Sequence, residues 1–486
     1  EESESQRSLE TESLLENKSA VLVVLEIDKP NKQGFAVVDT SFMGTVLAIL
    51  RLGGTILMAM MIMMIRYFSL FYFSGGYGLD VLEAVGAVIP AYQILTLTVG
   101  WAATQGFTFQ SAKYFSAQEY RNLGLLLNKT YLLSLPLSLF IAFFLFFFGS
   151  SIFSFFIKNT SALSSLDNMM KGMALGTPLY FLVLVNNKYY SCTREIFPLL
   201  VGSTIGLLTQ LVSLVILISW LEIVEIGVGL SLAIGNIGYL SFNTYYFYYH
   251  NPFPEVVIPW RWDETTEGLF PFIVYSLPLG LIVFVGYFST EIMQLAALTY
   301  SDLTFISYSI IQNIIGVTYC VGEAMALVSN IYLNYAVSSK RYDYMATVYY
   351  AVNFILIVYS IFIAILLGFL FEEILTLYTN VPYVLESILQ LKPYVIIVLI
   401  LMTFSSLNAE GISVVEGSTY PLITQVTCRY LIFIALCILF VKSTLLNELS
   451  FIIANLIAVT IAHIVNAGYL MIIISHKKDS DKIKEY

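Results

Sequence analysis

Long apolar segments recur along most of the chain and are separated by short polar breaks. About 20 apolar residues in helical form are enough to cross the hydrocarbon core of a bilayer. None of the segments alternates apolar and polar residues with the period of two that is typical of membrane β-barrel strands. The pattern predicts an all-α polytopic membrane protein of about twelve transmembrane helices. The predicted spans are residues 43–66, 80–104, 126–150, 168–190, 197–220, 226–248, 270–295, 303–328, 346–371, 391–414, 421–441 and 449–475.

Composition supports a membrane protein and excludes several other classes. Apolar residues make up 58% of the chain and charged residues only 12%, whereas soluble domains average about 25% charged residues. The net charge of −10 comes largely from the acidic N-terminus, and no basic stripe indicates a nucleic-acid partner. The four cysteines show no C-x-x-C spacing and the three histidines are far apart, so we predict no metal site and no cofactor.

The distribution of Lys and Arg predicts the orientation of the chain in the membrane. Cytosolic loops carry an excess of these residues, and an N-terminus inside the cell places most of them there. In this arrangement we predict that Arg66 lies at the outer end of the first helix. An even number of spans then puts both termini in the cytosol, in a plasma membrane or a vacuolar or endosomal membrane. The predicted cytosolic set is Lys113, Arg121, Lys129, Arg194, Arg261, Lys340, Arg341, Lys477, Lys478, Lys482 and Lys484.

The chain divides into two halves of six predicted helices. We predict a disordered cytosolic tail over residues 1–41, a first lobe over 42–250, an inter-lobe cytosolic loop over 251–268, a second lobe over 269–475 and a cytosolic tail over 476–486. Two similar halves joined by an inner loop are typical of alternating-access carriers, which bind substrate between the halves. A similar polar stretch follows helix 2 (111–120) and helix 8 (329–342), which indicates an internal repeat. Within the N-terminal tail, Glu10 to Leu15 fits an acidic dileucine sorting signal, and an accidental pair of leucines fits equally well.

Ionisable residues inside the spans are the candidate functional groups, because each costs about 2.5–3.5 kcal/mol at the bilayer centre on insertion scales. Three acids qualify: Glu291 in helix 7, Glu323 in helix 8 and Glu410 in helix 10. An acid in a dry cavity has a raised pKa, so a proton gradient can drive its titration. The three are therefore candidate cation-coupling or substrate residues; the alternative is a carboxylate at a helix end or paired with a neighbour.

Three short stretches resemble the multidrug and toxic compound extrusion (MATE) antiporters, particularly their eukaryotic branch. Ser276-Leu277-Pro278 with Glu291 thirteen residues later is similar to that family's Pro-led helix 7 ending in E-W-W-x-x-E. Residues 326–330 (Ala-Leu-Val-Ser-Asn) are similar to A-x-x-V-x-N-x-L-G-A, and residues 414–418 (Val-Val-Glu-Gly-Ser) to V-x-R-G-x-G. Each motif is degenerate: Gly286 replaces the first acid of helix 7, and only Glu291 matches a cation-coupling position of the family.

The resemblance implies a V-shaped fold of two six-helix lobes and the export of small organic compounds, chiefly cations, in exchange for protons or sodium. The expected partners are the lipid bilayer, a small organic substrate and the coupling ion, and the expected state is a monomer without enzymatic activity. Three alternatives stay open. They are a lipid or lipid-linked flippase, a non-transporting scaffold or receptor, and a membrane enzyme built on His463 and Asn466.

Overall fold

The computed structural model describes residues 41–484, with gaps at 75–76, 78, 155–159, 301, 339–340, 377, 379–381, 416–418 and 444–448. The N-terminal tail with its dileucine motif lies outside the described residues. All regular elements in the described part are helices. Ten of them are long and apolar enough to cross a membrane, and two shorter apolar helices, Leu269–Ile282 and Tyr430–Phe440, lie in the remaining two segments. The prediction of an all-α chain with about twelve spans is confirmed.

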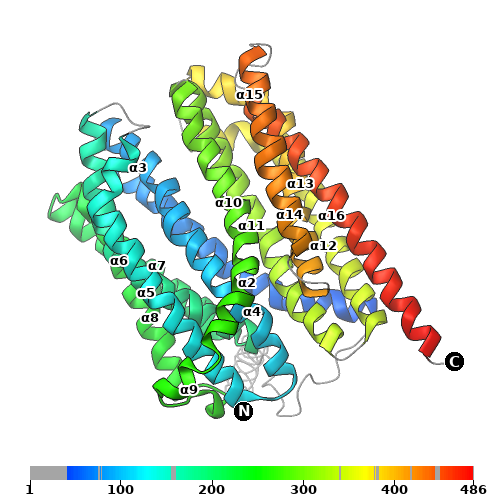
Figure 1. Ribbon diagram of the computed structural model, residues 1–486. Helices are drawn as coiled ribbons and strands as arrows, with labels where there is room; N and C mark the ends of the chain where they lie inside the picture. The colour runs from blue at the N-terminus through cyan, green and yellow to red at the C-terminus, as the bar shows by residue number, and fades with distance from the viewer. Residues whose placement is uncertain are drawn as a thin grey trace, which may run out of the picture.

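The first six helical segments form one bundle, coloured blue to green in Figure 1. They are α2 (Phe42–Ser74), the continuous segment α3 (Leu79–Tyr92), η1 (Gln93–Thr98) and α4 (Val99–Ser116), then α5 (Tyr120–Phe153), α6 (Thr160–Thr193), α7 (Ile196–Leu214) with η2 (Val215–Trp220), and α8 (Val224–Tyr249). Two short helices, η3 (Pro254–Val256) and α9 (Trp262–Thr266), lead into the second half.

The second six segments form the bundle coloured green to red in Figure 1. They are α10 (Leu269–Tyr300), α11 (Asp302–Ser338), α12 (Tyr342–Thr376), α13 (Pro382–Val415), then α14 (Thr419–Val426), η4 (Thr427–Ile432) and α15 (Phe433–Ser443), and α16 (Leu449–Lys484). Helix α10 runs between the two bundles, which together make the V-shaped arrangement of twelve helices (Figure 1).

Two polar stretches predicted as loops are helical. Residues 111–116 belong to α4, and residues 329–338 belong to α11, which is 37 residues long. Polar side chains in both stretches form hydrogen bonds to backbone carbonyls of their own helix: Ser111 donates to the Thr108 carbonyl and Asn334 donates to the Asn330 carbonyl. Polar residues of this kind therefore extend the helices past the apolar runs instead of ending them.

The buried apolar residues of the described chain form three clusters, and the positions of these clusters bear on how the two lobes can move relative to each other. One core cluster contains residues from both lobes, and all of them lie near the end of the bundle where α2 begins and α16 ends, which we call the termini end. A second cluster belongs to the opposite half of the first lobe, and a third to the opposite half of the second lobe. The two lobes thus share a core at the termini end and have their own cores at the opposite end, where Phe288 of α10 is the second-lobe residue packed against the first-lobe core.

Small residues bring the lobes close where α4 crosses α10. A Cβ atom on Gly280 would lie 2.6 Å from the Ala102 carbonyl oxygen, and one on Gly106 would lie 1.7 Å from Ser276 Oγ. Ala102 and Gly106, like Ser276 and Gly280, are spaced four residues apart, so each helix presents a face of small residues to the other. Such faces let transmembrane helices pack with their backbones in close contact.

Ring contacts join the lobes at both ends. At the termini end, Phe42 packs against Phe354 with ring centroids 5.8 Å apart, and the Arg194 guanidinium lies 5.0 Å from the centre of the Tyr332 ring. At the opposite end, Phe68 packs against Tyr378 at 6.4 Å. The termini end is therefore closed by a shared core and ring contacts, and the opposite end by a thinner contact.

Candidate binding site in the first lobe

A buried arginine occupies the middle of the first lobe. Arg66 lies well inside α2, because the helix continues from Tyr67 to Ser74, and its side chain is only 3% exposed. An arginine keeps its positive charge at any ordinary pH. Among the described residues, the ion pairs do not involve Arg66. The first lobe therefore holds a positive charge that no described carboxylate neutralises.

Neutral oxygen atoms hold the guanidinium in place. Arg66 Nε donates to Gln210 Oε1 at 2.7 Å, and Nη2 donates to Asn236 Oδ1 at 2.8 Å and to the Leu232 carbonyl at 3.4 Å. The two amides are themselves oriented: Gln210 Nε2 donates to the Arg66 carbonyl and Asn236 Nδ2 to the Gly176 carbonyl. This network joins α2, α6, α7 and α8 and fixes the direction of the guanidinium.

A glycine leaves the space that this arrangement needs. A Cβ atom on Gly235 would lie 2.7 Å from Arg66 Nη2 and 2.8 Å from the Gly206 carbonyl oxygen. Gly235 therefore permits both the close approach of α8 to α7 and the position of the guanidinium.

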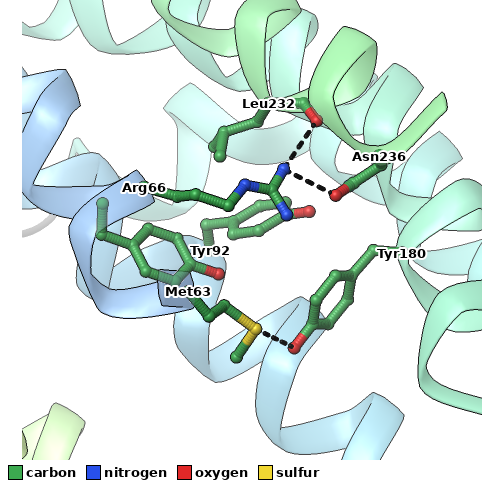
Figure 2. Close-up of a pocket in the computed structure, with 7 residues that line it drawn as sticks. Met63, Arg66, Tyr92, Tyr180, Leu232 and Asn236 are labelled. Atoms are coloured by element: carbon green, nitrogen blue, oxygen red, sulfur yellow. Dashed lines mark hydrogen bonds between the residues drawn. The ribbon is translucent and has the colours of Figure 1, made fainter. Parts of the chain in front are cut away.

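The guanidinium faces a small cavity. The cavity has room for about one water molecule, about 10 Å³, and is lined by Met63, Arg66, Tyr67, Tyr92, Tyr180, Leu232 and Asn236. Figure 2 shows the tyrosine rings gathered around the guanidinium. The Tyr180 hydroxyl makes a long contact of 3.9 Å with Met63 Sδ, and the Tyr92 hydroxyl is fully buried. The site thus combines one fixed charge, aromatic walls and a buried tyrosine hydroxyl.

The three acids predicted from the sequence lie in the second half of the chain. Glu323 is buried in α11, and its Oε2 accepts a 3.0 Å hydrogen bond from the Tyr319 hydroxyl. Glu291 lies in α10 and Glu410 in α13, but their side chains are outside the described part of the structure. Glu323 does not line the Arg66 cavity.

Other candidates from the sequence have structural roles in the second lobe. His463 Nδ1 lies 3.0 Å from Asn408 Nδ2, whose side-chain oxygen accepts a hydrogen bond from the Tyr349 hydroxyl. His463 also packs against the ring of Phe404. In the part of the chain that is described, no group of His, Cys, Asp and Glu has the arrangement of a metal site.

Comparisons with known proteins identify the class. The MatE family model matches residues 55–216. The eukaryotic MATE transporter AtDTX14 superposes with a TM-score of 0.83 at 12% identity, over 91% of this chain and 99% of that chain. The family model thus covers part of the first lobe, and the chain shares the fold of MATE transporters over nearly its whole length. An outward-facing multidrug resistance MATE transporter of the MOP superfamily gives a TM-score of 0.77 at 16% identity, over 89% of this chain and 97% of that chain.

A third structure is of interest for its binding pocket. A MOP superfamily transporter from Pyrococcus furiosus, described as having a binding pocket of reverse polarity that suggests a different function, gives a TM-score of 0.75 at 15% identity, over 88% of this chain and 96% of that chain. No curated protein sequence matches the chain. The structural matches show that the chain has the fold of MATE transporters.

The central residue of this site was not recognised in the sequence, and its predicted position was wrong. Arg66 was placed at the outer end of a helix because a charge normally ends an apolar run, whereas α2 continues for eight residues beyond it. The signal was present: the run after Arg66 is as apolar as the run before it, and two lone amides, Gln210 and Asn236, interrupt later apolar helices. An intramembrane arginine of this kind is by default a functional candidate, and lone amides are its natural partners.

Proposed function

We propose that this protein exports small organic compounds in exchange for protons or sodium, by alternating access between its two lobes. The observation that carries the proposal is the division of the core. The lobes share a packed core at the termini end, whereas at the opposite end each lobe has its own core, and the lobes touch through the Phe68–Tyr378 ring contact and through Phe288 of α10, which packs against the first-lobe core. A carrier that opens alternately to the two sides needs two ends that can close and separate independently.

The buried acids of the second lobe are the proposed ion-coupling groups. Glu323 supports this role because it is buried in a transmembrane helix and accepts a hydrogen bond from a neutral donor, the Tyr319 hydroxyl. Glu291 is proposed on its match to a family coupling position, and Glu410 on its place inside α13. Protonation of such an acid removes a buried charge, so binding of the driving ion changes the energy of the lobe that contains it.

The positive charge of Arg66 in the first lobe bears on the charge of the substrate that this lobe can bind. The resemblance to the family favours an organic cation, but the fixed positive charge of Arg66 disfavours a cation in the first lobe. The flippase alternative is not favoured, since the cavity described here contains one cation and about 10 Å³ of space, far less than the 300–1,000 Å³ typical of a pocket for a drug-sized ligand.

Cysteine pairs at the two ends of the lobes test alternating access. In a background without the native cysteines, one variant carries Phe42→Cys with Phe354→Cys at the termini end, and the other carries Phe68→Cys with Tyr378→Cys at the opposite end. A short bifunctional thiol reagent should link both pairs, and an imposed proton or sodium gradient should raise the yield of one pair while lowering that of the other. Yields that no gradient or substrate changes would show a static scaffold.

Amide variants test the coupling role. Glu291→Gln and Glu323→Gln keep the shape of the side chain but remove its charge, and a neutral amide costs less to bury than a carboxylate. A coupling acid should lose gradient-driven transport on this change while the protein still folds. Glu291→Asp should retain partial transport with a shifted pH profile. Transport by both Gln variants with an unchanged pH optimum would remove these residues from the mechanism.

A further inference from the structure

We propose that His463, in the second lobe, is a proton-binding site that acts through a chain of hydrogen bonds to Asn408 and Tyr349. Its part in driving transport rests on the function proposed above, to which it adds a coupling group other than the acids. Proton binding itself does not depend on transport, because it is a property of the second lobe alone.

The first argument is the depth of His463 in the membrane. The residue lies near the middle of the apolar span Phe451–His476, and its ring packs against that of Phe404 with centroids 5.7 Å apart. An ionisable side chain at this depth is costly to keep and is by default a functional candidate. Histidine is the side chain that ordinarily gains or loses a proton between pH 5 and 8.

The second argument is the direction of the hydrogen bonds around Asn408 of α13. Asn408 Nδ2 lies 3.1 Å from the Phe404 carbonyl oxygen, which can only accept, so the atom on this side is the amide nitrogen. On the other side, the Tyr349 hydroxyl of α12 donates to Asn408 Oδ1 at 3.1 Å. The second hydrogen of Nδ2 is therefore directed at His463 Nδ1, 3.0 Å away. Nδ1 can accept this bond only in a neutral ring that carries its hydrogen on Nε2.

A proton on His463 Nδ1 would break this chain. Two N–H groups would then face each other across 3.0 Å. If the Asn408 amide turned over, its Oδ1 would face the Phe404 carbonyl, and two acceptors cannot bond to each other. The junction of α12, α13 and α16 must therefore rearrange when the ring becomes charged.

A buried amide close to His463 suits the charged form of the ring. Asn466 follows His463 by three residues on α16, a spacing that makes side chains of a helix neighbours. Its side chain is 1% exposed, and neither its Oδ1 nor its Nδ2 has a hydrogen-bond partner among the described residues. Oδ1 can accept an N–H of the protonated ring once the bond to Asn408 is lost. The two residues considered above as an enzyme site are thus suited to holding a proton.

The first lobe contains the same pair of side chains without a histidine. The Tyr131 hydroxyl of α5 donates to Asn186 Oδ1 of α6, as Tyr349 of α12 donates to Asn408 of α13. In each lobe these helices are the third and fourth spanning segments. The hydrogen bonds described for Asn186 include none to a histidine, so the pair joins two helices by itself. A purely structural role therefore does not account for His463.

Other groups that can titrate lie on the helices that pack against α16. They are Tyr349 of α12, Glu410 of α13, Tyr420 of α14, Cys428, Arg429 and Tyr430 of η4, and Cys437 of α15. Tyrosine and cysteine ordinarily stay neutral, and arginine stays charged, between pH 5 and 7.5. The side chains of Glu410 and Arg429 are outside the described part of the structure. Glu410 is the group whose titration could be mistaken for that of His463, so it serves as a control.

Histidine resonances of the purified full-length protein in detergent give the direct test, because the chain has three histidines. With isotope-labelled histidine, the signal that is lost in His463→Asn belongs to His463. At pH 7.5 its nitrogen chemical shifts should show a hydrogen on Nε2 and none on Nδ1. Between pH 7.5 and 5 the ring should take up its second proton.

Two matched substitutions test the part played by Asn408. In Asn408→Asp a carboxylate can accept from a protonated Nδ1, so the midpoint of the His463 titration should rise by at least one pH unit, a 10-fold change in proton affinity. Asn186→Asp makes the same change in the first-lobe pair and should leave that midpoint where it is in the wild type.

A buried reporter tests whether the proton changes the packing. Leu470 of α16 is fully buried in the core that the lobes share. In a background without native cysteines, Leu470→Cys is labelled by a water-soluble thiol reagent, with His463 present and in His463→Asn. Asparagine offers Oδ1 in place of Nδ1 and cannot be charged. The ratio of the two rates cancels the pH dependence of the thiol; it should be near one at pH 7.5 and rise several-fold at pH 5.

The outcomes separate the hypotheses. A hydrogen on Nδ1 at pH 7.5, a ring that stays neutral down to pH 5, or a rate ratio near one at both pH values would each overturn the proposal. A pH effect on labelling that Glu410→Gln removes and His463→Asn does not would also overturn it. If His463→Asn does not fold, its signal is assigned by elimination from His250→Gln and His476→Gln, and the Asn408→Asp and Asn186→Asp spectra decide the question. Proton uptake by His463 in a protein that moves no solute would keep the site and reject the transport function.

Discussion

The glycine at the crossing of α4 and α10 offers a direct test of whether this contact between the lobes breaks during function. In Gly280→Ala, the new Cβ would lie 2.6 Å from the Ala102 carbonyl oxygen and 3.3 Å from the Ala102 Cβ. The closest atom belongs to the backbone and cannot rotate away, so the two helices must move apart. Overpacking of this kind typically costs about 1–3 kcal/mol.

The conformation in which the lobes separate at the termini end avoids this cost. The substitution should therefore favour that conformation by about 5- to 150-fold, the factor that corresponds to about 1–3 kcal/mol. Val328 reports on the change because it is fully buried in the core that the lobes share. In a background without native cysteines, Val328→Cys should react slowly with a charged, water-soluble thiol reagent, and Gly280→Ala should raise that rate by the same factor.

Two controls distinguish opening from general loosening. Gly54→Ala makes the same chemical change on α2, where a Cβ would meet nothing within 4 Å, and should leave the rate unchanged. A reporter at Leu145, in the separate core of the first lobe, should remain unreactive when Gly280 is replaced. An unchanged rate at Val328→Cys with a lower unfolding temperature would mean that α4 and α10 stay packed throughout, and would refute the reasoning.

Three further predictions concern the first lobe and its edge. Gly235→Ala should lower the unfolding temperature, because its Cβ would lie 2.7 Å from Arg66 Nη2 and displace the guanidinium from its partners Gln210 and Asn236; an unchanged unfolding temperature would contradict this. Arg194→Gln should speed labelling at the termini end several-fold, since the cation–π contact with Tyr332 is worth about 0.5–2 kcal/mol; an unchanged rate would show that this contact does not hold the end closed. Glu195 lies between α6 and α7, and burial raises its pKa although the Tyr246 hydroxyl opposes this. The folded state then holds this proton to a higher pH than the unfolded state does, so the free energy of unfolding should fall as the pH rises from about 4.3 through the raised pKa. The unfolding temperature of Glu195→Gln should fall less than that of the wild type over the same pH range.

The sequence was sufficient to predict the helices because the bilayer imposes their length. Runs of about 20 apolar residues have few alternatives to a spanning helix. The helix ends were less accurate, as in α4 and α11, because Ser111 and Asn334 bond to carbonyls of their own helices. Polarity alone does not distinguish such residues from loop residues.

The candidate site was not predictable in the same way, because its parts are distant in sequence. The partners Gln210 and Asn236 follow Arg66 by 144 and 170 residues, and nothing local in the sequence pairs them. The burial of the Tyr92 hydroxyl is likewise evident only once the packing around it is known. The acids Glu291, Glu323 and Glu410 could be selected from sequence alone because a charge inside an apolar run is itself the signal.

The most direct test of the central claim is transport by the purified protein in proteoliposomes. Labelled small organic compounds are supplied with an imposed proton or sodium gradient, to the wild type and to Glu323→Gln. The account predicts accumulation of at least one compound driven by one of the gradients, with this gradient dependence lost in Glu323→Gln. Folded wild-type protein that moves no solute under either gradient would contradict alternating-access transport.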